Sequence, residues 1–265
     1  MSVQALYTAA TGMEALETKL DVIANNLANV STVGFKKDRA NFEDLFYRHE
    51  VIPGTEQAAP ETGVGISVGL GTRISSVQSD LAQGSGQMTN RPTDMMIQGP
   101  GYFQVADANG NFFYTRAGNF TRNGNGFLVM GSGNQGRILE PNIQIPNDST
   151  NLTINEDGSV FVMQPGDTAP AQIGQIQLSM FPNPAGLLKM GDNLYQVSEA
   201  SGQAQELNPG QQGAGVLRQN MLENSNVEPV RELIDLIQTQ RNFELNSQAV
   251  QTGDQMMQLI SNLRR

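Results

Sequence analysis

The chain has 265 residues, and its 16 Lys and Arg against 26 Asp and Glu leave a formal net charge of −10. A chain this acidic is a poor candidate for binding nucleic acid or anionic lipid through its overall charge. It contains no Cys, which excludes disulfides, thiolate metal sites and thiol nucleophiles. It also contains no Trp and a single His, so most catalytic constellations lack the residues they need. We therefore expect a protein that is not an enzyme, needs no cofactor and holds no metal.

Near the N-terminus, apolar residues recur every seven positions in two series offset by three. These series are Leu6, Met13, Leu20 and Leu27, and Ala9, Leu16, Ile23 and Val30. The pattern is that of the a and d positions of a coiled coil. Gly34 is expected to end the helix, because a helix C-terminus commonly needs a left-handed residue. The sequence therefore predicts a helical segment over residues 1–35.

A connecting region follows over residues 36–80, and its part from 46 to 75 is rich in Gly and Pro. Apolar residues there alternate with Gly and Ser, as they do in an extended strand. We expect an extended, hairpin-like arm with little core of its own, which must lie against something else. The residues that characterise this arm are Val51, Pro53, Gly63, Gly65, Gly69 and Leu70.

The middle of the chain, residues 81–204, is expected to be a β-rich domain. Short runs of β-forming residues alternate there with turn signals such as Asn109-Gly110 and Asp157-Gly158. Asn-Gly and Asp-Gly between such runs are strong hairpin signals. Residues 205–224 would then lead back as a second connecting segment.

The C-terminal segment, residues 225–265, is expected to be a second long helix, with Pro229 in its first turn. One apolar stripe contains Val230, Leu233, Ile234 and Ile237, and another contains Ala249, Met256, Ile260 and Leu263. Gly253 in the helix interior costs about 1 kcal/mol relative to Ala. The chain is thus expected to be α+β, a mainly-β centre flanked by long coiled-coil helices that pair with each other and with neighbouring subunits.

The motifs that usually indicate catalysis or ligand binding are incomplete in this chain. His49 has no second His or Cys as a partner, so it is interpreted as a loop or surface residue. The segment from Asp107 resembles the start of a calcium loop, but Phe112 replaces the required Gly, and a hairpin turn is favoured. The run Gly63–Gly71 lacks the ending of a phosphate-binding loop. Acidic pairs that could serve a glycosidase are expected by chance in so acidic a chain.

Several segments resemble the axial proteins of the bacterial flagellum, the rod and hook family. The N-terminal stretch 20–36, with its Ala24-Asn25-Asn26-Leu27 core, is similar to the rod and hook signature. The stretches 97–105, 114–121 and 174–181 resemble the β-domain of that family. Ser225-Asn226-Val227 and the stretch 238–247 resemble its terminal helix. The chain length and the Gly/Pro-rich arm favour the distal rod within this family.

The resemblance implies a structural subunit of a rigid, hollow helical tube that transmits torque from motor to hook. The implied partners are other copies of the chain, proximal rod proteins, the hook protein, the P-ring and L-ring bushing and the flagellar type III export apparatus. The first residues do not form a secretory signal and no segment spans a membrane, which alone would indicate a cytoplasmic protein. The resemblance implies instead a rod that crosses the periplasm and outer membrane after export without a cleaved signal.

The resemblance and the apolar patterns together predict which residues lie at subunit interfaces. They are Leu6, Met13, Leu16, Leu20, Ile23, Asn25, Asn26, Leu27, Val230, Ile234, Ile237, Met256 and Ile260. Two alternatives remain open: another axial subunit, either proximal rod or hook, and more distantly a secreted carbohydrate-binding or hydrolytic β-protein. The latter would need a concave aromatic cleft, whereas aromatic residues make up 6% of the chain.

Overall fold

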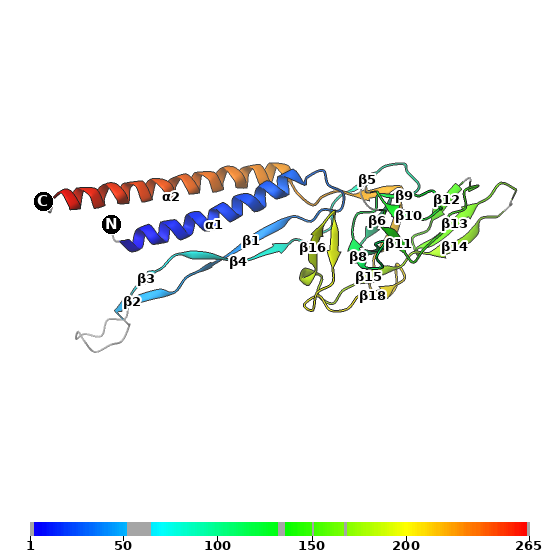
Figure 1. The fold of residues 1–265 in the computed structure, drawn as a ribbon, viewed down its shortest axis with the longest axis horizontal. Coiled ribbons are helices and arrows are strands. Elements are labelled where there is room, and N and C mark those ends of the chain that lie inside the picture. Colours follow the sequence, from blue (N-terminus) through cyan, green and yellow to red (C-terminus); the bar gives the residue numbers. More distant parts are fainter. Residues whose placement is uncertain (1–2, 52–64, 132–135, 150, 167–168, 264–265) are drawn as a thin grey trace. The chain divides into compact units, whose positions relative to one another are not determined.

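The computed structural model describes residues 3–51, 65–131, 136–149, 151–166 and 169–263. A long helix near each end of the chain flanks a mainly-β central region, which confirms the predicted α+β class (Figure 1). The chain divides into two compact units. The helical unit contains residues 1–28, 38–80 and 228–265, and the β unit contains residues 29–37 and 81–227. No helix within the described residues is long and apolar enough to cross a bilayer.

Among the described residues, the helical unit contains two helices and two pairs of antiparallel strands. The helices are α1 (Val3–Ala28) and α2 (Pro229–Leu263). The strands are β1 (Asp38–Asp44), β2 (Tyr47–Val51), β3 (Ile66–Gly69) and β4 (Thr72–Ser79), with β1 paired to β4 and β2 to β3. Helix α1 contacts α2 and also contacts β1 and β4. The two helices run antiparallel, with the start of α1 beside the end of α2 (Figure 1).

The β unit consists of short antiparallel strands. Among the described residues, its largest sheet has seven strands in the order β16-β17-β8-β7-β11-β10-β9, and a second sheet has the order β12-β13-β14. The remaining pairs are β15-β18, β19-β6 and β20-β5. The strands are β5 (Gly86–Met88), β6 (Met95–Gln98), β7 (Phe103–Ala106), β8 (Phe112–Thr115), β9 (Phe120–Arg122), β10 (Leu128–Met130), β11 (Ile138–Glu140), β12 (Asn151–Ile154), β13 (Ser159–Met163), β14 (Ala171–Gln175), β15 (Leu178–Met180), β16 (Leu188–Gly191), β17 (Leu194–Gln196), β18 (Gln205–Leu207), β19 (Val216–Gln219) and β20 (Met221–Glu223). A 3₁₀ turn, η1, spans Pro184–Gly186.

The core of the β unit is a continuous apolar cluster contributed by most of its strands. Ile97, Phe103, Val105, Phe120 and Leu178 are among its fully buried side chains. A second cluster contains the aromatic rings of Tyr102, Tyr114, Phe181 and Tyr195. The turn after Asp107 is the expected hairpin turn between β7 and β8, closed by an N–H of Gly110 that donates to the Asp107 carbonyl.

Two details of the N-terminal segment differ from expectation. Helix α1 ends at Ala28 instead of reaching residue 35, so Val30 and Gly34 lie outside it. Residues 29–37 belong to the β unit, where Val33 packs against the core. Gly34 does have a positive φ of 69°, but its N–H donates to the carbonyl of Glu223. A Cβ there would come within 2.8 Å of the Ala117 nitrogen, so this glycine permits close packing of two backbones.

The unit boundaries also differ from the predicted segments. Residues 38–80 belong to the helical unit and are not a separate connecting region, because β1 and β4 pack on α1. Residues 205–227 belong to the β unit, because β18, β19 and β20 each pair with one of its strands.

Candidate functional site

The face of α2 that packs against α1 is small and polar. Glu232 and Thr239 are buried on it, and Asn246 and Gly253 continue the same line at seven-residue spacing. Apolar periodicity missed this seam because none of the four side chains is apolar. A heptad of polar and small residues is the signal that could have revealed it.

Close packing between the two helices depends on these small residues. A Cβ at Gly253 would meet Leu6 Cδ2 at 2.4 Å, and a Cβ at Gly12 would meet Asn246 Nδ2 at 3.2 Å. At the other end of the pair, Asn26 Nδ2 donates to Glu232 Oε2 at 3.3 Å. Gly253, which the sequence suggested was a weakness of the helix, is therefore where α1 approaches α2.

Most of the predicted interface residues of α1 are partly covered within the chain itself. Five of them are half-buried: Leu6, Met13, Leu16, Leu20 and Leu27. Ile23 is buried, at 4% exposure, whereas Asn25 is exposed. Asn26 is 1% exposed. Its amide holds the start of β1 by accepting the N–H of Asp38 at 2.8 Å and donating to the Asp38 carbonyl at 2.9 Å.

The predicted interface residues of α2 lie on its outer side. Val230 is 71% exposed, Ile234 is 52% exposed and Ile237 is 50% exposed. Together with Leu233, which is 46% exposed, they form what we call the exposed apolar stripe of α2. Met256 is also exposed, and the side chain of Ile260 lies outside the described residues. Single exposed apolar side chains are common on protein surfaces, but these four lie together along one helix face and form a patch.

The predicted arm residues fall partly on β2 and β3. Val51 ends β2 and is exposed, Gly69 ends β3, and Leu70, which follows it, is exposed. Gly65 precedes β3 and is half-buried, whereas Pro53 and Gly63 lie outside the described residues. His49 lies exposed on β2.

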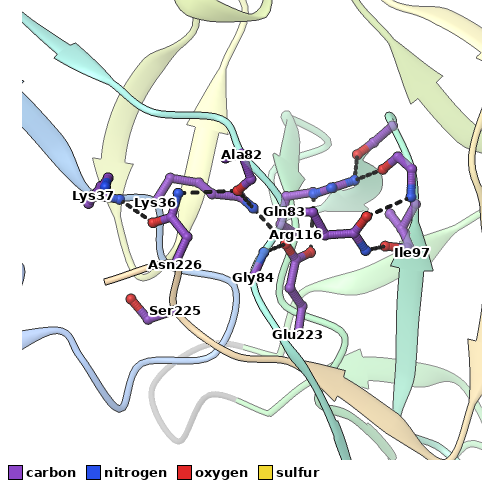
Figure 2. A network of polar contacts seen from close by, with 12 residues as sticks. Lys36, Lys37, Ala82, Gln83, Gly84, Ile97, Arg116, Glu223, Ser225 and Asn226 are labelled. Carbon is purple, nitrogen blue, oxygen red and sulfur yellow. Dashed lines mark hydrogen bonds and ion pairs between the residues drawn. The ribbon is translucent and has the colours of Figure 1, made fainter. Parts of the chain in front are cut away.

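The β unit contains a buried ionic network that is centred on Glu223 (Figure 2). Sequence patterns gave no sign of this network. The Glu223 side chain is 0% exposed, and Lys36 Nζ lies 2.5 Å from its Oε1. Arg116 Nε lies 3.4 Å from Oε2, and the N–H of Gly84 donates to Oε1 at 3.0 Å. Two cations and a backbone donor thus surround one buried carboxylate, which offsets the cost of removing it from water.

This network joins three segments that are distant in sequence. Lys36 Nζ also donates to the Ala82 carbonyl at 2.8 Å, and Asn226 Nδ2 donates to the same carbonyl at 3.1 Å. Asn226 Oδ1 accepts the N–H of Lys37 at 2.8 Å (Figure 2). Residues 34–37, 82–84 and 223–226 are therefore fastened to one another at the places where the chain enters and leaves the β unit.

Three family models match the chain in order. The model described as "Flagella basal body rod protein" matches residues 6–36, and "Flagellar hook protein FlgE/F/G D1 domain" matches residues 96–162. "Flagellar basal body rod FlgEFG protein C-terminal" matches residues 218–263.

Curated relatives match over almost the whole chain. The flagellar basal-body rod protein FlgG of Buchnera aphidicola subsp. Schizaphis graminum is 43% identical over 262 residues, covering 98% of this chain and 100% of the relative. FlgG of Caulobacter vibrioides is 43% identical over 263 residues, covering 98% and 99%. FlgG of Bacillus subtilis is 39% identical over 269 residues, covering 99% of each.

Proposed function

The chain belongs to the FlgG family of flagellar basal-body rod proteins, and on that premise we propose that it polymerises into a rigid, hollow helical tube that transmits torque from motor to hook. It is a structural subunit of the flagellar distal rod, and it is located in the flagellar basal body. The observation that carries this conclusion is the 43% identity that extends over 98% of the chain.

Subunits join through the exposed apolar stripe of α2. The polar seam of α2 is occupied by α1 within the chain, so the stripe is left for another copy. Burying these apolar side chains against a second copy would be favourable by about 25 cal/mol for each Å² removed from water. A head-to-tail contact that continues without closing would place this stripe against a different patch of the next copy. Of the predicted interface residues, Val230, Ile234 and Ile237 are therefore assigned to contacts between subunits, in coiled-coil fashion.

The strand pair β2 and β3 forms part of a hairpin-like arm that lies across adjacent subunits and stiffens the tube. Exposed apolar side chains support this assignment, because Phe46 is 87% exposed and Ile66 is 55% exposed. An added strand between subunits would oppose the sliding that bending requires. Deleting residues 51–70 should leave subunits that still assemble, but into curved or flexible tubes.

The remaining partners follow from the position of a distal rod. We assign proximal rod proteins to one end of the tube, the hook protein to the other, and the P-ring and L-ring to its outside. The subunit would reach this place through the flagellar type III export apparatus without a cleaved signal, and the rod would cross the periplasm and outer membrane.

Electron microscopy of the purified full-length chain under polymerising conditions tests the proposal. We expect straight hollow tubes from the natural sequence and from the control Gln172→Asp, which places a charge at an exposed residue of β14 in the β unit. Ile234→Asp should stay monomeric, because a charge in an apolar contact costs several kcal/mol unless it is paired. Compact closed oligomers from the natural sequence would contradict the proposal, and so would tubes from Ile234→Asp.

A further inference from the structure

The helical unit has a groove to which α1, α2, β1 and β4 all contribute residues. Its volume is about 420 Å³, and its walls include Leu16 of α1, Phe42 of β1 and Leu245 of α2. Phe42 is 41% exposed and Leu245 is 62% exposed. Two large apolar side chains therefore remain in water beside a hollow of the same unit, as they do on surfaces that bind a partner.

Small residues of α1 leave room for this groove. Gly12, Ala15, Leu16 and Lys19 all line it, because residues three or four positions apart lie on one face of a helix. Gly12 has no side chain and Ala15 has only a methyl group, so this face of α1 fills little of the space between its neighbours. Side chains of another molecule have room to enter there.

The exposed apolar stripe of α2 has the spacing of a helix that binds in a groove. Its four residues occupy positions i, i+3, i+4 and i+7, which are the anchor positions of an amphipathic helix in an apolar groove: Val230, Leu233, Ile234 and Ile237. The stripe and the groove have no residue in common. One copy can therefore present its stripe to the groove of the next copy while its own groove receives the stripe of a third.

Charge favours the same pairing. Among the described residues, Lys19 is the one charged residue that lines the groove, and it forms no ion pair with Asp or Glu. The stretch 228–237, which carries the stripe, has three acidic residues against one basic residue: Glu228, Glu232, Asp235 and Arg231. An acidic helix is thus attracted to a groove that holds an unpaired cation, and the attraction helps to set its orientation.

We propose that this groove receives the exposed apolar stripe of a second copy of the chain. The inference rests on the proposed polymerisation and adds to it the surface that the stripe meets on the next copy. One contact then removes Phe42, Leu245 and the stripe from water together, which is the favourable change that drives association.

Disulfide cross-linking of the assembled full-length chain tests this contact. The chain contains no Cys, so Ile234→Cys combined with Phe42→Cys places one thiol in the stripe and one in the groove. After mild oxidation of the tubes, we expect a ladder of linked dimers, trimers and longer chains on a denaturing gel, with loss of most of the monomer band. Each single variant should remain monomeric on that gel. So should the control that combines Ile234→Cys with Gln172→Cys, at an exposed residue of β14.

The outcomes separate this inference from the proposed function. Tubes of the paired variant that give no ladder would overturn the groove as the surface that meets the stripe, and would leave polymerisation intact. Linked dimers from Ile234→Cys alone would also overturn it, because two stripes would then meet each other. If the paired variant does not assemble, Ile237→Cys with Leu245→Cys asks the same question. A natural chain that forms no tubes would overturn the inference together with the proposed function.

Discussion

Lys36 and Glu223 are 187 residues apart in the chain, yet Lys36 Nζ lies 2.5 Å from Glu223 Oε1 in the interior of the β unit. Both side chains are almost completely buried, at 2% and 0% exposure. The pair fastens the segment that follows α1 to the strand that precedes α2. In a subunit that has to transmit force, such a contact would hold the points where the chain enters and leaves the β unit.

Breaking this buried pair should be costly. Lys36→Met leaves Glu223 with a weaker ion pair and one fewer donor, and we expect a loss of about 3–5 kcal/mol in the free energy of unfolding. The matched control is Arg218→Met, because Arg218 Nη1 also lies 2.5 Å from a carboxylate, that of Glu156, but at the surface. That exposed pair should contribute about 1 kcal/mol or less. Urea unfolding measures both variants, and equal losses would contradict the role given to burial.

The close approach at Gly253 predicts a local effect on the helix pair. Gly253→Leu should force α1 and α2 apart near Leu6, because a Cβ at that position already meets Leu6 Cδ2. Overpacking of this kind costs about 1–3 kcal/mol. Hydrogen exchange should then accelerate in the first turns of α1. The exposed control Gln255→Leu should leave the exchange unchanged, and unchanged exchange in Gly253→Leu would refute the packing described for this seam.

The aromatic cluster predicts a loss of stability at alkaline pH. Burial raises the pKa of Tyr102 above its usual value of 10.0, and burial together with Glu206 raises the pKa of Tyr114. The unfolded chain therefore ionises these phenols first, so the free energy of unfolding is unaffected below pH 10 and falls as the pH rises above it. Tyr102→Phe should make this fall shallower, as measured by urea unfolding between about pH 9 and pH 11. An equal decrease in the free energy of unfolding with pH for Tyr102→Phe and the natural chain would contradict the assignment. Tyr7→Phe, at an exposed residue, serves as control.

The apolar stripe predicts variants that separate assembly from folding. Ile237→Asp should prevent polymerisation and yet change the free energy of unfolding of the monomer by about 0.5 kcal/mol or less, because the residue is half exposed. Ile23→Asp should destabilise the monomer itself, since Ile23 is 4% exposed within its own chain. Sedimentation and thermal unfolding distinguish the two variants. A strongly destabilised Ile237→Asp monomer would place that side chain inside the subunit.

Local patterns predicted the two terminal helices and the β-rich centre, because heptads and Asn-Gly or Asp-Gly turns act over short distances. They also placed Pro229 at the start of α2. They could not predict the polar seam through Thr239 and Asn246, because apolar periodicity does not register residues that pack through small size. Nor could they pair Lys36 with Glu223, because no local rule joins residues that lie 187 positions apart.

The end of α1 illustrates the same limit. The apolar series continues to Val30, but the helix stops at Ala28 because the residues after it are taken up by the β unit. The sequence predicts a left-handed conformation at Gly34, and its φ is 69°. Its reason is the approach of the Ala117 backbone, which is a tertiary contact and not a helix cap.

Solvent access to the stripe of α2 tests most directly whether this face joins the subunits of the rod. The chain contains no Cys, so Ile237→Cys carries a unique thiol whose labelling by a maleimide can be followed in monomers and in assembled tubes. The labelling rate of this thiol should fall by about tenfold or more on assembly, because the centre of an interface excludes water. Gln172→Cys, at an exposed residue of strand β14, gives the reference labelling rate for both states. If the thiol at position 237 is labelled as fast in tubes as in monomers, relative to that reference, the stripe does not join the subunits.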